Sequence, residues 1–236
     1  YLRRPALNAL PSGQRQLISL VLWKLLASSS YAIGGALGTM AQRLQDKLGA
    51  ESSDTPTEEL TDTLDKDYES LDETEDEWSE QDEGLAAAPL ASVAEEIAEL
   101  REFQRLATTI RDNAKGQALG KAFAELEKLG AAKKALIFTE SRRTQDYLLG
   151  LLEQSAYAGQ TVLFNGTNTS EQATRIYQAW LQRHAGTDRI TGSRTADTRA
   201  ALVEHFRDSA QIMIATEAGA EGINLQFCSL VINYDL

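Results

Sequence analysis

Short apolar runs separated by segments of helical periodicity fill the second half of the chain and constrain its fold most strongly. Runs that are apolar throughout are typical of parallel strands, because helices cover such a sheet on both faces. We predict strands at 135–138, 161–164, 189–191, 211–215 and 230–234. We predict helices at 142–153, 170–184 and 195–206. The expected fold class is α/β, a parallel sheet with helices on both faces.

The residues before this region show a different pattern. Apolar side chains recur at helical spacing on both sides of an acidic run, which predicts a helical protrusion at 1–50 and a helical linker at 90–130. Residues 51–83 hold 16 acidic residues against one lysine. Because like charges repel and there is little apolar surface to bury, we predict a disordered or loosely held acidic linker or insertion at 51–89. A nucleic-acid mimic that shields a basic surface is the alternative.

The net charge of −12 is concentrated in that acidic run. The rest of the chain holds 19 acidic and 22 basic residues and is mildly basic. Basic side chains also follow the polar faces of the helices expected at 90–130, either as a solvated face or as a track beside a nucleic acid. Composition therefore does not exclude a DNA or RNA partner.

Several classes of protein are excluded by simple features. The chain has no apolar stretch of about 18 residues and no charged-then-apolar leader, so we predict no membrane span or signal peptide and a cytoplasmic location. It begins at Tyr1 rather than Met and stops after an apolar run, so we expect both ends to lie inside a longer protein. The single cysteine, Cys228, excludes an intrachain disulfide. His184 and His205 lack a third ligand in sequence, and we predict no metal site.

Residues 31–38 are rich in glycine and alanine and have the composition of a phosphate loop. However, no strand is predicted before them, and no Lys-Ser/Thr pair follows. We therefore interpret these small residues as a surface at which two helices approach closely.

Two connections near strand ends carry hydroxyls and positive charge. Ligands of parallel sheets bind at the carboxyl ends of the strands. After the first predicted strand, Ser141 is placed to cap the next helix and Arg142 adds charge, which suits a phosphate but equally suits capping without a ligand. Gly192, Ser193 and Arg194 open another helix in a similar way, with a plain turn as the alternative.

The connection at 214–226 is the most distinctive segment. It packs two glycines, two carboxylates, one hydroxyl and two amides between two predicted strands, a polarity that a plain turn does not require. In order and spacing, this segment and the loops at Ser141 and Ser193 resemble the second RecA-like lobe of superfamily-two helicases, specifically the Swi/Snf-related ATPases of bacteria. The resemblance covers 133–236.

This resemblance implies a RecA-like helicase C-terminal lobe at 131–236, truncated at its C-terminus. Such a lobe contacts a nucleic-acid backbone and contributes part of an ATP site between two lobes. The nucleic-acid-binding residues that it implies are Thr139, Ser141, Arg142, Gly192, Ser193, Arg194 and Thr216. The implied nucleotide-binding residues are Glu221, Gly222 and Asn224, and we expect Glu217 and Glu221 to fix the loop. Glu221 replaces the arginine of many RNA helicases, which favours the Swi/Snf-related branch.

The sequence lacks two elements of an ATPase site. It contains no Gly-x-x-x-x-Gly-Lys-Ser/Thr segment and no Asp-Glu-x-His-type strand end to hold magnesium. Phosphoryl transfer depends on both. We therefore predict that ATP and Mg²⁺ are bound mainly by an absent N-terminal RecA-like lobe of the same parent chain. We predict no catalytic residue within these 236 residues, and no ATP hydrolysis by them alone.

The parent protein expected from this resemblance is an ATP-dependent translocase or remodeller on double-stranded DNA. Two alternatives stay open at this point. One is a lobe of an RNA-remodelling helicase, and the other is a non-catalytic α/β scaffold or protein-binding module.

Overall fold

The computed structural model describes residues 1–2, 4, 7–10, 15–49, 90–110, 114–128 and 134–235. Their contacts divide the chain into two compact units, Tyr1–Asn113 and Ala114–Leu236. The acidic run predicted to be a linker or insertion lies outside the described residues. The domain boundaries drawn from the sequence at 50, 90 and 130 stay predictions.

The described part of the first unit is helical, with α1 at Arg15–Ser28, α2 at Ser30–Gly49 and α4 at Leu90–Thr109. The glycine-rich segment lies inside α2 and faces α4. A Cβ atom added to Gly38 would lie 2.3 Å from Nε2 of Gln104, and one added to Gly34 would lie 3.3 Å from Cβ of Ala107. This close approach confirms the interpretation of these residues as a helix-packing surface.

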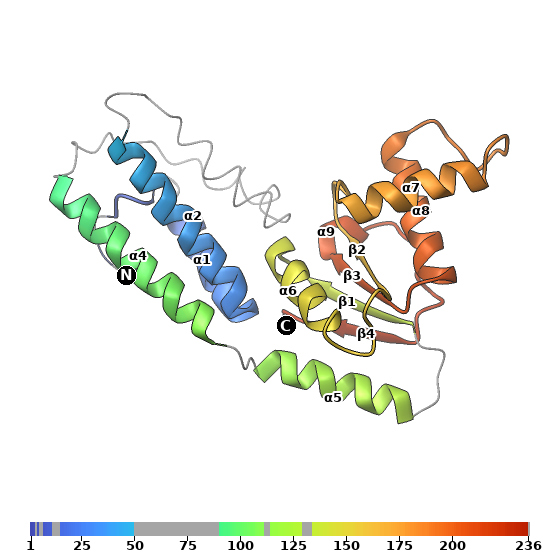
Figure 1. Cartoon of the computed structure of the whole chain (residues 1–236), viewed down its shortest axis with the longest axis horizontal. Coiled ribbons are helices and arrows are strands. Elements are labelled where there is room, and N and C mark those ends of the chain that lie inside the picture. Colours follow the sequence, from blue (N-terminus) through green and yellow to red (C-terminus); the bar gives the residue numbers. More distant parts are fainter. Residues whose placement is uncertain are drawn as a thin grey trace. The chain divides into compact units, whose positions relative to one another are not determined.

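The second unit is built on a four-stranded parallel sheet with strand order β2-β3-β1-β4. The strands are β1 at Ala135–Thr139, β2 at Thr161–Phe164, β3 at Ile212–Thr216 and β4 at Leu230–Asn233. The helices are α5 at Ala114–Lys128, α6 at Arg142–Leu152, α7 at Glu171–Arg183, α8 at Arg194–Asp208 and the short α9 at Glu217–Ala220. Figure 1 shows α5 and α6 on one side of the strands and α7 and α8 on the other.

Alternate residues of the central strands belong to two separate hydrophobic cores, one on each face of the sheet. Ile137 and Ile214 pack with Leu148 of α6 and with Phe123 of α5 on one face. On the other face, the core is formed by Leu136, Met213, Val162, Ala173 of α7, and Leu202 and Phe206 of α8. The predicted α/β sheet with helices on both faces is therefore confirmed.

Residues 189–191 do not form the strand that was predicted. The N–H and the hydroxyl of Thr191 both donate to the same carboxylate oxygen of Asp197, at 3.0 and 2.7 Å. The backbone N–H of Thr191 therefore donates to a side chain of α8 and not to a neighbouring strand. The segment forms the loop that precedes α8. The helix α9 was not predicted.

Candidate functional site

The carboxyl edge of the sheet brings together loops that are far apart in the sequence. In the parallel register Thr139 lies opposite Thr216, and Phe164 lies opposite Ala215, so β1, β2 and β3 end at nearly the same level. The connections that follow these strands therefore meet at one edge, as the sequence predicted for this kind of sheet.

Gln145, in the first turns of α6, joins the ends of two strands. Its side chain is buried, and Nε2 donates to the carbonyls of Phe164 at 2.8 Å and Ile214 at 3.0 Å. Its Oε1 accepts from Nδ2 of Asn165 at 3.3 Å. Gln145 is not among the site residues predicted from the sequence. A lone amide among the apolar positions of a helix was the available signal.

The loop after β1 is fixed mainly through buried groups. The hydroxyl of Thr139 donates to Asp235 at 2.5 Å, and the N–H of Glu140 donates to the same carboxylate oxygen at 2.6 Å. Ser141 lies at the N-cap position of α6, but its buried hydroxyl does not cap the helix and has no hydrogen-bond partner among the described residues. Arg142 reaches the neighbouring loop, where its guanidinium donates to the hydroxyl of Thr167 at 2.8 Å.

The loop after β2 is an asparagine turn that sequence analysis did not identify as part of the site. The N–H of Asn165 donates to Oδ1 of Asn168 at 2.9 Å, and the N–H of Asn168 donates to Oδ1 of Asn165 at 2.7 Å. Asn168 has a positive φ of 48°, a conformation that asparagine tolerates better than most residues. Ser170 then caps α7 by accepting from the N–H of Ala173.

The loop at 191–193 is organised by the buried carboxylate of Asp197. Besides Thr191, it accepts from the N–H of Gly192 at 3.1 Å, and Gly192 has a φ of 83°. The hydrogen bond from the Thr191 N–H is the main cause of the lowered pKa of Asp197. Ser193 caps α8 by accepting from the N–H of Ala196 at 3.4 Å, and Arg194 is exposed at the first position of the helix.

The loop after β3 begins with a buried threonine cap. The hydroxyl of Thr216 accepts from the N–H of Gly219 at 3.2 Å and starts α9. Gly219 is pressed against the loop after β2, since an added Cβ would lie 2.7 Å from both Cα and the carbonyl carbon of Asn165. Gly222 has a φ of 73° and leads into an open stretch of chain.

The predicted nucleotide-binding residues lie on this same stretch, at its surface. Glu221 and Asn224 are exposed. The side chain of Asn224 accepts from the N–H of Gln226 at 3.1 Å. Arg199 of α8 donates to the carbonyl of Glu221 at 2.7 Å while its guanidinium lies 5.2 Å from the ring centre of Phe164. Arg199, which is not among the predicted site residues, thus links α8, β2 and the 221–224 stretch.

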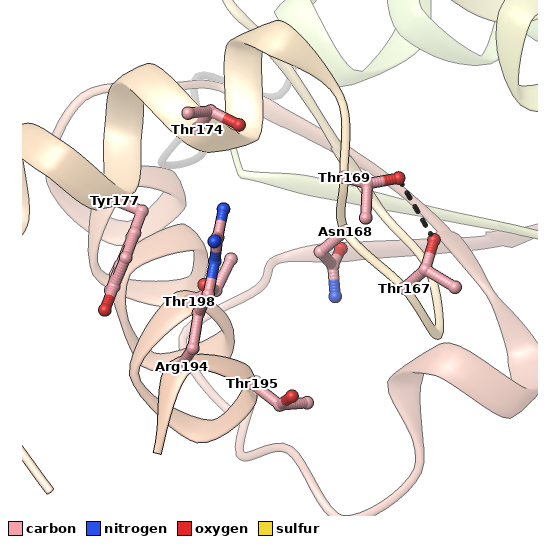
Figure 2. Close-up of a pocket in the computed structure, with 8 residues that line it drawn as sticks. All are labelled: Thr167, Asn168, Thr169, Thr174, Tyr177, Arg194, Thr195 and Thr198. Atoms are coloured by element: carbon pink, nitrogen blue, oxygen red, sulfur yellow. Dashed lines mark hydrogen bonds between the residues drawn. The ribbon is translucent and has the colours of Figure 1, made fainter. Parts of the chain in front are cut away.

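A pocket of about 220 Å³ lies where the loop after β2 meets α7 and the start of α8. Residues 167–169, Thr174 and Tyr177 line one part, and Arg194, Thr195 and Thr198 line the other. Figure 2 shows Arg194 extending from the start of α8 between Tyr177 and Asn168. Of the residues predicted to bind nucleic acid, Arg194 and Arg142 are therefore brought to the same asparagine turn.

Among the described residues, no group of three or more histidine, cysteine, aspartate or glutamate side chains is arranged to hold a metal ion. None of the described helices has the length and apolar character that crossing a membrane requires.

Residues 145–236 match the family described as the helicase conserved C-terminal domain. A stretch of 70 residues is 43% identical to the uncharacterized ATP-dependent helicase YqhH of Bacillus subtilis (strain 168). That stretch is 29% of this chain and 13% of the relative, so the chain spans a small part of that protein's length. No solved structure matches.

The matched region starts in α6 and contains the loops after β2 and β3 and the helix start at Ser193. Together with β1, which precedes it in the chain, this region forms a parallel sheet with helices on both faces, the fold expected of a RecA-like helicase lobe. Residues 145–236 are therefore similar to a helicase C-terminal lobe in both sequence and fold.

Proposed function

We propose that the chain supplies the C-terminal lobe of an ATP-dependent translocase on double-stranded DNA, of the Swi/Snf-related branch. The observation that carries this proposal is the meeting of three polar loops at one edge of the sheet, with two arginines on the asparagine turn. Backbone phosphates are held by guanidinium groups, hydroxyls and helix N-termini, and such contacts position a strand without reading its sequence.

Burial divides the proposed nucleic-acid-binding residues into two groups. Thr139, Ser141 and Thr216 are each about 1% exposed, so in this proposal they set the positions of the loops that carry backbone N–H groups. Ser193 and Arg194 are exposed and Arg142 is partly exposed, and these three make the direct phosphate contacts. Gly192 allows the turn before them through its positive φ.

The stretch from Glu221 to Asn224 is proposed to border the nucleotide across from an N-terminal lobe of the same parent protein. Its exposure leaves Glu221 and Asn224 available to a second lobe. ATP and Mg²⁺ would be held mainly by that lobe, because this sequence has neither a phosphate loop nor a magnesium-binding strand end. We accordingly propose that the chain alone does not hydrolyse ATP.

ATPase measurements on the intact parent protein test the proposal. We expect double-stranded DNA to stimulate turnover more than RNA does, and the stimulation to weaken as salt is raised. The Arg142→Gln variant should reduce the stimulation, whereas Arg175→Gln, which removes an exposed arginine of α7, should not. Stronger stimulation by RNA would assign the lobe to an RNA helicase. No stimulation by either nucleic acid would favour a scaffold.

A further inference from the structure

The outer edge of β2 carries backbone groups that pair with no strand among the described residues. β2 stands at the end of the strand order and pairs with β3 on one side only. Along a strand, the backbone groups of successive residues are directed to alternate sides. The carbonyl of Gln160 accepts from the N–H of Ile212 at 3.0 Å, so the groups of Thr161 and Leu163 are directed outward, away from β3.

The side chain of Gln172, the second residue of α7, binds this outward side of β2. Its Nε2 donates to the carbonyl of Thr161 at 2.8 Å, and its Oε1 accepts from the N–H of Leu163 at 3.4 Å. These are the two partners that a residue opposite Val162 would have on a neighbouring parallel strand. One carboxamide thus reproduces the hydrogen bonds of a strand residue. Thr161 is 1% exposed, so bulk water has no access to replace Gln172 there.

The sequence of β2 lacks the usual protection of an edge strand. Such strands commonly carry lysine, proline or a bulge, because their N–H and C=O groups can otherwise pair with another chain. Residues 154–170 contain no charged residue and no proline, and the register of β2 with β3 shows no bulge. A second copy of the chain presents the same uncharged, strand-forming edge, and it is therefore the partner that this edge would accept.

We propose that Gln172 closes the outer edge of β2 against pairing with a second copy of this chain. The carboxamide occupies the carbonyl of Thr161 and the N–H of Leu163, so neither group is available to another strand. The same two hydrogen bonds hold the start of α7 against the sheet. This role concerns self-association and is independent of the nucleic-acid and nucleotide contacts proposed above.

Sedimentation velocity over a range of chain concentrations tests the proposal. Gln172→Ala removes the carboxamide, and it should raise the self-association constant about tenfold above that of the unaltered chain. Gln178→Ala alters an exposed glutamine of the same helix and should leave the constant unchanged. Gln172→Glu also loses the donor to Thr161, but its negative charge opposes strand pairing. This variant should therefore self-associate no more than the unaltered chain does.

Amide hydrogen exchange shows whether β2 is the surface that pairs. At low concentration, the N–H of Leu163 should exchange faster in Gln172→Ala than in the unaltered chain, because its acceptor has been removed. Raising the concentration should slow this exchange again, since the N–H then donates to a second copy.

Three outcomes would overturn the proposal. Gln172 does not close the edge if Gln172→Ala associates no more than the unaltered chain. Equal association of Gln172→Ala and Gln172→Glu would assign the effect to a general loss of stability. Association that leaves the N–H of Leu163 in fast exchange would place the contact on another surface.

Discussion

Arg199 of α8 donates a 2.7 Å hydrogen bond to the backbone carbonyl of Glu221, across 22 residues of sequence. The same guanidinium lies over the ring of Phe164 at the end of β2. One side chain thus ties the 221–224 stretch to the helix that carries Ser193 and Arg194. The proposed nucleotide-binding and nucleic-acid-binding residues are mechanically linked through it.

Replacing Arg199 with glutamine should loosen this link. A charged hydrogen bond contributes about 1.5–3 kcal/mol and an exposed cation–π contact about 0.5–1 kcal/mol, and partial solvent exposure lowers both. We expect the free energy of unfolding to fall by about 1 kcal/mol and amide exchange at 221–224 to accelerate. Arg207→Gln is the control on the same helix, since it removes only an exposed pair with Asp208. Unchanged exchange at 221–224 would refute the link.

Gly219 is predicted to tolerate no side chain. An alanine there would place its Cβ 2.7 Å from two backbone atoms of Asn165, so the loops after β2 and β3 would have to separate. Overpacking of this kind costs about 1–3 kcal/mol, which urea unfolding followed by tryptophan fluorescence would measure. Gly150→Ala, in α6 with open space around it, should instead stabilise the chain by about 0.5–1 kcal/mol. Equal stability of the two variants would contradict the close packing.

Gln145→Met should destabilise the carboxyl edge of the sheet while preserving the volume of the side chain. The carbonyls of Phe164 and Ile214 would each lose a buried hydrogen bond, and unsatisfied buried groups cost about 1–3 kcal/mol. Urea unfolding would show the loss. The matched control, Gln154→Met, removes an exposed amide that donates only to the carbonyl of Gly150 at the end of α6. An unchanged free energy of unfolding in Gln145→Met would mean that these two hydrogen bonds do not stabilise the fold.

The sheet itself was predictable because its signal is local. The apolar runs predicted the bounds of β1 and β2 to within one residue. A strand that is covered on both faces forms a continuous apolar run, so its ends are easy to locate in the sequence. The strand predicted at 189–191 was wrong. The side chains there suit a strand, but the backbone N–H of Thr191 donates to the carboxylate of Asp197 and cannot donate to a neighbouring strand. The sequence of 189–191 itself does not indicate that a side chain of α8 will accept this hydrogen bond.

The site was less predictable because its contacts join distant residues. The starts of the helices after Thr139 and at Ser193 could be predicted, because glycine, hydroxyl and arginine residues there are typical of a helix N-terminus. The pocket is lined by Asn168 of the loop after β2 and by Thr198 of α8, which are 30 residues apart in sequence and are brought together only by packing. The sequence shows Gln145 only as a lone amide among the apolar positions of a helix, and its role follows from the ends of β2 and β3 that lie beside it.

Glu204 of α8 is the centre of the contact between α7 and α8. Its carboxylate accepts from Nε1 of Trp180 at 3.2 Å, from Arg183 at 3.0 Å and from Arg189 at 3.2 Å. The ring of His184 lies 2.9 Å from the same group. Burial alone would raise the pKa of Glu204, but the hydrogen bonds from His184, Trp180 and Arg183 outweigh it and lower the pKa to about 2.

This pKa predicts how the stability of the α7–α8 contact depends on pH. Between the usual value of 4.5 and about 2, the unfolded chain binds a proton at Glu204 that the folded chain does not. The stabilisation is therefore complete above about pH 4.5 and is lost as the pH falls towards 2. Glu204→Gln should cost about 1.5–3 kcal/mol at neutral pH, as expected for lost hydrogen bonds to a charged group. Urea unfolding of both proteins across the acid range should show their difference narrowing only below about pH 4.5, because the wild-type carboxylate then becomes neutral as well. A difference that stays constant through this range would mean that the charge of Glu204 does not stabilise the contact.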